Sequence, residues 1–227
     1  STLERSSAAS DVYKRQLEQA KLGKSKSQAM QGQVVIVTGG GGAIGSAIAK
    51  EFHADGAEIL LVDKHAEKLE QVRSQIDPKI PIFQADVTQP DAPTRLIEAV
   101  TKTYGGVDML ISNAGFAQQS SIIDMDQKLL RDSFELNFFA HFALAQEVLK
   151  AFRKQVIDGQ ILFNVSKQAV NPGQNFGAYG LPKSALFFLV RQMALEFGGD
   201  GVRVNGVNAD RIRSGLLNDA MIAERSN

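Results

Sequence analysis

The fold of this chain is decided by the stretch Val34-Val35-Ile36-Val37-Thr38-Gly39-Gly40-Gly41-Gly42-Ala43-Ile44-Gly45. Its apolar start is typical of a buried strand, and the glycines after it open an amphipathic segment, 46–52. A second apolar run, 59–62, then ends at Asp63. Strand, glycine turn, helix, strand and acid in this order indicate a dinucleotide-binding βαβ unit.

The glycines and the acid have distinct chemical uses. Glycines let the backbone turn tightly and approach a pyrophosphate, and the helix N-terminus offers free N–H groups to that anion. The Asp63 carboxylate would accept hydrogen bonds from the adenosine ribose and repel a phosphate on it, so we expect NAD rather than NADP. An NTPase phosphate loop fits poorly, because it needs Lys-Ser or Lys-Thr after the last glycine, and Ser46-Ala47 stands there. The predicted cofactor residues of this unit are Thr38, Gly39, Gly42, Ala43, Ile44, Gly45 and Asp63.

The composition bounds the class of protein. With 227 residues, the chain is long enough for one α/β domain with a sizeable core. Basic and acidic side chains balance at 25 each, so no global field attracts nucleic acid or an acidic membrane. No apolar run is long enough to span a bilayer, and the absence of cysteine excludes disulfides and thiolate chemistry. We expect a cytoplasmic protein without nucleic-acid or membrane partners.

The three histidines show no metal-ligand spacing, so no metal site is expected. His65 is expected at a solvated helix start. His53 and His141 are interpreted as helix-surface or packing residues.

Residues 1–32 differ from the rest of the chain, because they are polar and carry no sustained strand pattern. Within them, 6–16 resembles translated adaptor sequence more than protein, with a native disordered tail as the alternative, and 17–22 is expected as a short helix before a linker. From Gln33 strands and helices alternate, which predicts one domain over 33–227 with a doubly wound parallel sheet, a three-layer α/β/α Rossmann fold. Strands are expected at 33–38, 58–63, 80–85, 107–112, 159–165 and 202–207. Helices are expected at 44–54, 65–76, 90–104, 125–153 and 178–197.

Two of these helices, 125–153 and 178–197, are unusually apolar. Neither can bury all of its large side chains against one sheet face. We therefore expect the excess to form a homo-oligomer interface, and the alternative is a loosely covered core helix.

Tyr179 and Lys183 stand four positions apart on a predicted helix, so they share one face. Such a pair is usually a solvated face, but this one follows the fifth strand, at the sheet edge where ligands bind. We expect the ammonium to lower the pKa of Tyr179 toward neutrality and make it a base for an alcohol proton. Ser166 ends the fifth strand, either as a turn former or to hold a substrate oxygen. Asn137 is either exposed on its helix or buried with backbone, water and Lys183 as partners.

Together these motifs resemble the short-chain dehydrogenase/reductase family over roughly residues 33–215. The family's Thr-Gly-x-x-x-Gly-x-Gly pattern matches at Thr38, Gly39 and Gly45, and Ala43 replaces the middle glycine. The resemblance implies hydride transfer with a nicotinamide cofactor. It implies a catalytic tetrad of Asn137, Ser166, Tyr179 and Lys183, with Lys167 as an alternative at the serine position. Further cofactor contacts are implied for Asp86, Val87, Asn113, Ala114, Gly115, Tyr179, Lys183, Ile212 and Ser214.

The chain departs from the family pattern in several places. Pro182 lies directly before Lys183, so the helix must begin close to Ala178. Ala209-Asp210 replaces the usual Pro-Gly, a change expected to loosen the nicotinamide loop. The sequence stops inside the family's substrate lid and before its final strand, so the resemblance implies a fragment at both ends with one sheet edge uncovered.

The stretches 166–176 and 17–22 are similar to the dehydrogenase half of bifunctional rhamnulose-phosphate aldolase/lactaldehyde dehydrogenases. That similarity implies a small hydroxyaldehyde such as lactaldehyde as substrate, rhamnose catabolism, and an aldolase domain upstream in the parent protein. Without cysteine, aldehyde oxidation would proceed through the hydrated gem-diol. The alternatives are a generic carbonyl reductase or sugar-alcohol dehydrogenase, and a cofactor-binding fragment without turnover.

Overall fold

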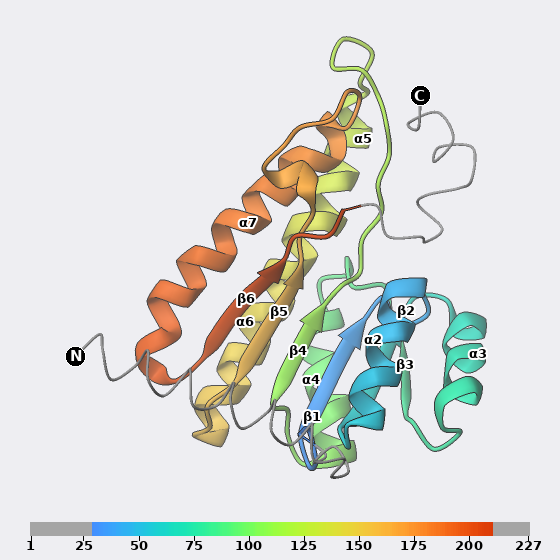
Figure 1. Ribbon diagram of the computed structural model, residues 1–227, viewed down its shortest axis with the longest axis vertical. Helices are drawn as coiled ribbons and strands as arrows, with labels where there is room; N and C mark the ends of the chain where they lie inside the picture. The colour runs from blue at the N-terminus through green and yellow to red at the C-terminus, as the bar shows by residue number, and fades with distance from the viewer. Residues whose placement is uncertain (1–28, 211–227) are drawn as a thin grey trace, which may run out of the picture.

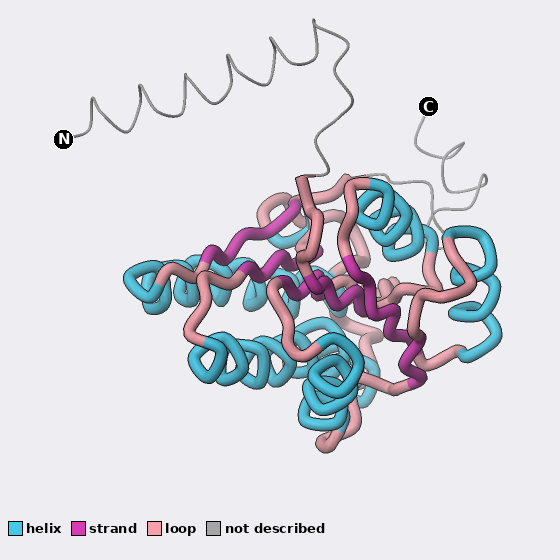
Figure 2. Tube along the Cα trace, turned by 90° about the horizontal axis from the view of Figure 1, so that it is seen from below, coloured by secondary structure: helices cyan, strands magenta, loops and turns pink. Residues whose placement is uncertain are grey.

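The computed structural model describes residues 29–210, which form a six-stranded sheet between two helical layers (Figures 1 and 2). All strand pairs are parallel, and the strand order is β3-β2-β1-β4-β5-β6. The strands are β1 (Val34–Thr38), β2 (Glu58–Asp63), β3 (Ile82–Gln84), β4 (Met109–Ser112), β5 (Gln160–Asn164) and β6 (Arg203–Val207). Successive strands are added outward on one side of β1 up to β3 and on the other side from β4 on, so the strand order reverses between β1 and β4. This is the switch point at which doubly wound sheets bind ligands. The predicted fold class is confirmed.

The central strands are buried on both faces, as their continuous apolar runs predict. All five residues of β1 are buried, and the Cα of Val37 pairs with Leu61 on β2 and with Ile111 on β4. This register brings Thr38, at the end of β1, level with the ends of both neighbouring strands. The glycine loop therefore leaves the sheet at the centre of its carboxyl edge.

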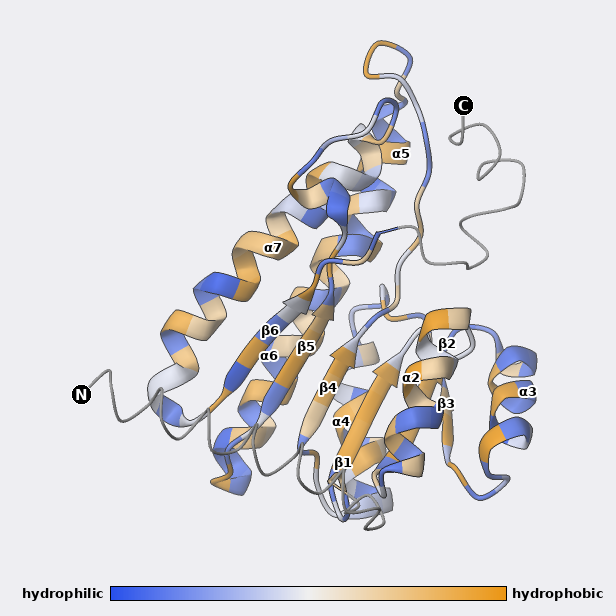
Figure 3. Ribbon diagram, in the orientation of Figure 1, coloured by the Kyte–Doolittle hydropathy of each residue, from blue (hydrophilic) through white to orange (hydrophobic). Residues whose placement is uncertain are grey.

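The helices divide between the two faces of the sheet (Figure 1). Ala49 of α2 (Ala43–Ala54) and Leu69 of α3 (Ala66–Ile76) pack on one face with Val35 and Val37 of β1. The opposite face of β1 packs into a second cluster with the helices α4 (Ala92–Tyr104), α6 (Ala140–Gln155) and α7 (Gly177–Phe197). Figure 3 shows the resulting apolar strands beneath amphipathic helices. Two short 3₁₀ segments, η2 (Lys167–Ala169) and η3 (Gly198–Asp200), complete the secondary structure around α7.

The predicted helix 125–153 is helical from Gln127 to Gln155 but is not an α-helix throughout. It consists of α5 (Gln127–Phe134), a π-helical segment η1 (Glu135–Phe139) and α6, and the N–H of Ala140 donates to the carbonyl of Glu135. An apolar period does not distinguish a π turn from an α turn, so the sequence could not reveal it. The extra residue per turn places Asn137 within the wide segment.

The helix α7 starts at Gly177, one residue before the predicted Ala178. Pro182 lies inside the helix, in the second turn, and is buried. Its position removes one N–H from the helix and is tolerated close to the N-terminus. Within residues 29–210, β6 is an edge strand; the predicted fate of residues 216–227 and of the helix at 17–22 lies outside the described residues.

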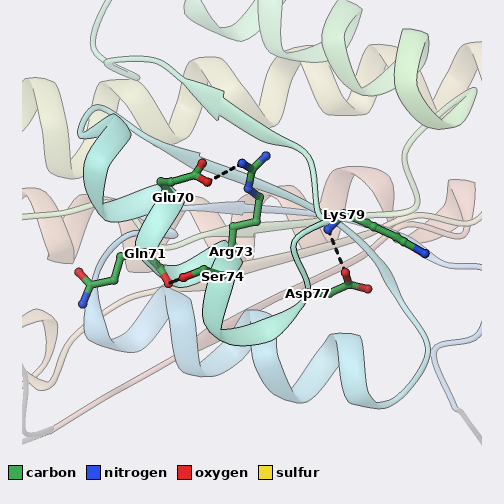
Figure 4. A network of polar contacts seen from close by, with 6 residues as sticks. All are labelled: Glu70, Gln71, Arg73, Ser74, Asp77 and Lys79. Carbon is green, nitrogen blue, oxygen red and sulfur yellow. Dashed lines mark hydrogen bonds and ion pairs between the residues drawn. The ribbon is translucent and has the colours of Figure 1, made fainter.

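The outer helix α3 carries a polar surface network (Figure 4). Arg73 donates to Glu70, Ser74 donates to the carbonyl of Gln71, and the Lys79 N–H donates to Asp77 at 2.9 Å in the turn toward β3. Exposed pairs of this kind contribute about 0–1 kcal/mol each to the stability of the fold. We therefore interpret the network as a solvated helix surface and not as a functional site. Across residues 29–210, none of the helices combines the length and the apolar character that crossing a bilayer requires.

Candidate active site

The glycine loop is shaped by two close backbone approaches. Gly39 has φ +65°, and a Cβ there would lie 3.0 Å from the Cα of Ala114. A Cβ on Gly45 would lie 2.2 Å from the carbonyl oxygen of Gly39, so only glycine fits. The loop therefore folds tightly between β1 and α2, as the sequence predicted.

The first turn of α2 keeps its N–H groups available. Gly42 is the N-cap residue, and no side chain caps the helix. The loop is closed by its own backbone, because the Gly42 N–H donates to the carbonyl of Gly39 at 3.0 Å. The arrangement leaves the N-terminus open for an anion such as a pyrophosphate.

Thr38 joins the loop to the end of β4. Its Oγ1 accepts hydrogen bonds from the N–H groups of Asn113 at 2.9 Å and Ala114 at 3.1 Å. The Asn113 side chain donates back to the Thr38 carbonyl at 3.0 Å and accepts from Asn164 on β5 at 2.9 Å. Three neighbouring strand ends are thus fixed to one another, which holds the floor of the site rigid.

Two carboxylates mark the end of the site where adenosine would lie. Asp63 accepts hydrogen bonds from the N–H of Gly41 at 3.1 Å and of His65 at 3.0 Å. Burial alone would raise the pKa of Asp86, yet hydrogen bonds from Thr88 and the charge of Lys64 outweigh it and leave the pKa lowered. Both carboxyl groups are therefore oriented by hydrogen bonds before any ligand arrives.

Ser166, Tyr179 and Lys183 converge at the carboxyl end of β5. The Ser166 hydroxyl lies close enough to the Tyr179 phenol to lower its pKa, and the Lys183 Nζ lies 5.7 Å from the centre of the tyrosine ring. The lysine is buried and donates to the Asn164 carbonyl at 2.8 Å. The alternative serine position, Lys167, pairs instead with Asp210 at 3.1 Å. The geometry therefore favours Ser166 as the partner of Tyr179.

The expected direction of the tyrosine pKa is wrong for the free protein. Burial raises the pKa of Tyr179, and the nearby Ser166 hydroxyl only partly offsets it. Burial also lowers the pKa of Lys183 to about 7, so the amine holds its positive charge weakly near neutral pH. The sequence showed the spacing of the two groups but not their desolvation, and desolvation dominates here.

Asn137 is fully buried, and its partners are backbone and serine rather than Lys183. Its Nδ2 donates to the carbonyl of Phe116 at 3.0 Å and to Ser133 Oγ at 3.1 Å, and its Oδ1 accepts from the Phe116 N–H at 3.2 Å. A Cβ on Gly115 would lie 2.9 Å from that oxygen and 3.7 Å from the Lys183 Nζ. Asn137 therefore anchors the segment after β4, and the lysine lies just beyond it.

A cavity of about 890 Å³ connects these groups. Of the predicted site residues, the ones that line it are Gly39, Gly42, Ala43, Ile44, Gly45, Asp63, Asp86, Val87, Asn113, Ala114, Gly115, Ser166, Tyr179 and Lys183. Thr38 and Asn137 support it from behind, and Ile212 and Ser214 lie outside the described residues. A smaller cavity of about 300 Å³, near Phe152 and Phe197, contains none of the predicted site residues. No metal-binding cluster of three or more acidic or histidine side chains occurs within 29–210.

Several residues around the cavity escaped sequence reasoning. His141 is buried on α6, with its Nδ1 2.6 Å from the equally buried Ser112 Oγ. Burial lowers its pKa well below the usual value, so the ring is neutral at pH 7. Asn164 and Gln168 line the cavity as well. His141 was interpreted only as a surface or packing residue, because its burial depends on how α6 packs on the sheet.

The loop after β6 is better anchored than its sequence suggests. The N–H of Val165 donates to the Val207 carbonyl at 2.9 Å, and that of Lys167 to the Ala209 carbonyl at 3.0 Å. With the ion pair between Lys167 and Asp210, these bonds continue the β5–β6 ladder past the sheet. These contacts anchor the start of the loop as far as Asp210, and the rest of the nicotinamide loop lies outside the described residues.

A strand-end serine, a helical tyrosine and a buried lysine facing a glycine loop on a doubly wound sheet are typical of nicotinamide-dependent oxidoreductases. Comparison with known families agrees, because the profile described as short chain dehydrogenase matches residues 33–224. The chain belongs to the short-chain dehydrogenase family.

Characterised relatives act on varied substrates. The chain is 32% identical over 181 residues to glucose 1-dehydrogenase of Gluconobacter oxydans, a match covering 78% of this chain and 68% of that protein. It is 31% identical over 198 residues to 7alpha-hydroxysteroid dehydrogenase of Escherichia coli, covering 86% and 77%. Among solved structures, levodione reductase superposes with a TM-score of 0.80 at 26% identity, covering 85% and 76%. The family is therefore fixed, while the substrate is not common to its members.

One relative is much longer than this chain. The uncharacterized oxidoreductase YuxG of Bacillus subtilis is 30% identical over 188 residues, which is 81% of this chain but 27% of YuxG. The chain thus spans about a quarter of that protein's length.

Proposed function

We propose that this protein transfers a hydride between NAD and a small hydroxyaldehyde or secondary alcohol. The observation that carries the proposal is the convergence of Ser166, Tyr179 and the buried Lys183 in the same cavity as the glycine loop. These groups can hold an oxygen atom and exchange its proton. When bound, the nicotinamide accepts or supplies the hydride.

Each residue has a defined task in this scheme. Ser166 donates a hydrogen bond to the reacting oxygen, and Tyr179 takes its proton during oxidation or returns it during reduction. Lys183 lies beneath the tyrosine ring and favours the phenolate whenever it is protonated. Asn137 fixes the Phe116 backbone and supports a water relay toward Lys183. Because the pKa of Tyr179 is raised, oxidation should accelerate as the pH increases above neutrality.

The preference for NAD over NADP is supported by Asp63. Its carboxylate is held in place by the N–H groups of Gly41 and His65, so it cannot swing aside to admit a phosphate on the adenosine ribose. Asp63→Ser removes the repelling charge. We expect kcat/KM for NADP to rise relative to that for NAD in this variant, and an unchanged ratio would contradict the assignment.

Lactaldehyde is the leading substrate because of the similarity at 166–176 to lactaldehyde dehydrogenases. In this chain Ser166 opens that segment and faces Tyr179, as oxidation of a gem-diol requires. The length of YuxG agrees with a parent protein that carries a second domain, for which an upstream aldolase of rhamnose catabolism in the cytoplasm is the proposal. A generic carbonyl reductase or sugar-alcohol dehydrogenase is the second candidate, favoured by relatives such as glucose 1-dehydrogenase. The third is a cofactor-binding module without turnover.

Assembly through 125–153 and 178–197 is supported by exposed apolar side chains on α6 and α7. Phe142 is 37% exposed, Phe188 60% and Leu195 81%. Arg191 lies over Phe188, with its guanidinium 5.5 Å from the ring centre. An apolar surface of this kind favours a second copy of the chain. Phe188→Glu should convert an oligomer into monomers in sedimentation analysis.

The function is tested by following the absorbance of NADH, the reduced form of the nicotinamide cofactor. Lactaldehyde with NAD should produce NADH in the wild type, and Tyr179→Phe should reduce the rate by about 10²–10⁴-fold while NADH binding persists. Tyr104→Phe is the matched control, because Tyr104 does not line the cavity, and it should leave the rate unchanged. Turnover of sugar alcohols without lactaldehyde would favour the second candidate. NAD binding without turnover of any hydroxy substrate would favour the third.

A further inference from the structure

The 3₁₀ segment η2 brings Gln168 beside the reacting groups. The Gln168 N–H donates to Ser166 Oγ at 3.2 Å. A Cβ on Gly180 would lie 3.2 Å from the Gln168 carbonyl oxygen, so glycine at that position lets η2 approach α7 one residue from Tyr179. Ser184 donates to the Ala169 carbonyl at 3.0 Å and fixes the other end of η2. Gln168 is therefore part of a rigid wall next to the catalytic hydroxyls.

The side-chain amide of Gln168 has one fixed end and one available end. Its Oε1 accepts the Gly173 N–H at 2.6 Å, which settles the orientation of the amide. Its Nε2 has no hydrogen-bond partner among residues 29–210 and is not enclosed by protein, and the residue lines the large cavity. The cavity thus contains an oriented donor that the hydride-transfer scheme does not use.

The surroundings indicate what that donor would bind. Lys167, the neighbouring cation in the cavity wall, is paired with Asp210 at 3.1 Å, so this wall does not offer a free charge to a carboxylate. Phe116 and Phe176 supply apolar surface in the same cavity. A neutral oxygen on a short carbon chain matches this combination.

We propose that Gln168 is a specificity-determining residue, whose Nε2 donates to a hydroxyl oxygen on the carbon next to the reacting one. The substrate class is then a small α-hydroxy carbonyl compound or the corresponding vicinal diol. This inference rests on the proposed hydride transfer but is separable from it. It concerns discrimination between substrates and not the chemical step.

Two variants separate the donor from the loop that it supports. Gln168→Glu keeps an oxygen acceptor for the Gly173 N–H and replaces the donor by a carboxylate oxygen, and the Gln174→Glu control carries the same added charge. Gln168→Met removes both the acceptor and the donor. Gln174→Glu is the matched control, because Gln174 is exposed in the same loop and does not line the cavity.

The substrates are matched pairs that differ by the α-oxygen: lactaldehyde against propanal with NAD, and hydroxyacetone against acetone with NADH. We expect kcat/KM of Gln168→Glu to fall about tenfold for the hydroxylated member and to change less than twofold for the other, as loss of one hydrogen bond predicts. Gln174→Glu should keep the wild-type ratio. If the loop also shifts, Gln168→Met should lower kcat/KM for both substrates of a pair, and more strongly for the hydroxylated one.

Failure of each proposal has its own signature. If Gln168→Glu turns over the substrates and the ratio of kcat/KM between the hydroxylated and the unhydroxylated substrate is unchanged, the role of Gln168 is overturned and hydride transfer stands. If no pair is turned over, hydride transfer fails, and saturation-transfer NMR of hydroxyacetone and acetone on the NADH-loaded protein then decides. A preference for hydroxyacetone that is lost in Gln168→Glu supports the donor, and no preference in the wild type refutes it.

Discussion

Replacing Lys183 by methionine should stabilise the cofactor-free protein while abolishing its turnover. The lysine is 2% exposed, and burial lowers its pKa from 10.5 to about 7. Methionine keeps most of the stem and removes the amine. Removing the amine should raise the free energy of unfolding. The Asn164 carbonyl loses its hydrogen bond in the exchange, which offsets about 1–2 kcal/mol of that increase.

The magnitude follows from linkage between folding and protonation. The pKa of Lys183 is 10.5 in the unfolded chain and about 7 in the folded protein, a difference of about 3.5. Burying the ammonium therefore costs on the order of 5 kcal/mol at a pH where the lysine is protonated in both the folded and the unfolded state. Between those pKa values the unfolded chain holds a proton that the folded protein releases, so stability rises with pH. From about pH 7 to about pH 9.5 the wild type should gain about 3 kcal/mol, and Lys183→Met should be more stable at pH 7 by about 2–4 kcal/mol.

The pH window excludes the other shifted groups. The raised pKa values of Tyr179 and Tyr104, the latter about 12, affect stability only above the usual tyrosine value of 10. The lowered pKa of His141 makes the folding stability depend on pH only below about pH 6.5. The slope between these limits therefore reports on Lys183.

Urea unfolding followed by circular dichroism measures the effect, because the chain lacks tryptophan. The wild type should show the rising slope, Lys183→Met should lack it, and the exposed-site variant Lys102→Met should retain it. Equal slopes in the wild type and Lys183→Met, or a less stable Lys183→Met at pH 7, would refute the reasoning.

Three other variants test the supporting structure. Gly45→Ala places a methyl group 2.2 Å from the Gly39 carbonyl oxygen, so it should destabilise the fold by about 1–3 kcal/mol and abolish NADH binding, measured by urea unfolding and fluorescence titration. Asn137→Ala leaves the Phe116 backbone groups unpaired and should cost about 1–3 kcal/mol and lower kcat more than it raises KM; unchanged kinetics would contradict its anchoring role. His141→Leu removes a group that is neutral when folded and charged when unfolded at acid pH, so the loss of stability below about pH 6.5 should become shallower; an unchanged acid profile would show that His141 is not its cause.

The sequence by itself determined the fold class and most of the cavity lining. Apolar runs such as 34–37 and the glycine spacing from Gly39 to Gly45 act over a few residues, and with the right-handed crossover rule they predict a doubly wound parallel sheet. The order of its strands came from the structure. Because strand ends meet at one edge of a parallel sheet, the positions of Ser166 and Tyr179 along the chain sufficed to predict their meeting.

Only the tertiary structure decided the charge states and the second contacts of those residues. The π segment at Asn137, the hydrogen bond of Lys183 to the Asn164 carbonyl and the free donor of Gln168 each depend on groups distant in the chain. The raised pKa of Tyr179 reversed the expectation from its spacing to Lys183. Spacing along a helix fixes which side chains are neighbours, but desolvation depends on everything packed around them, and that is settled only when the helices close on the sheet.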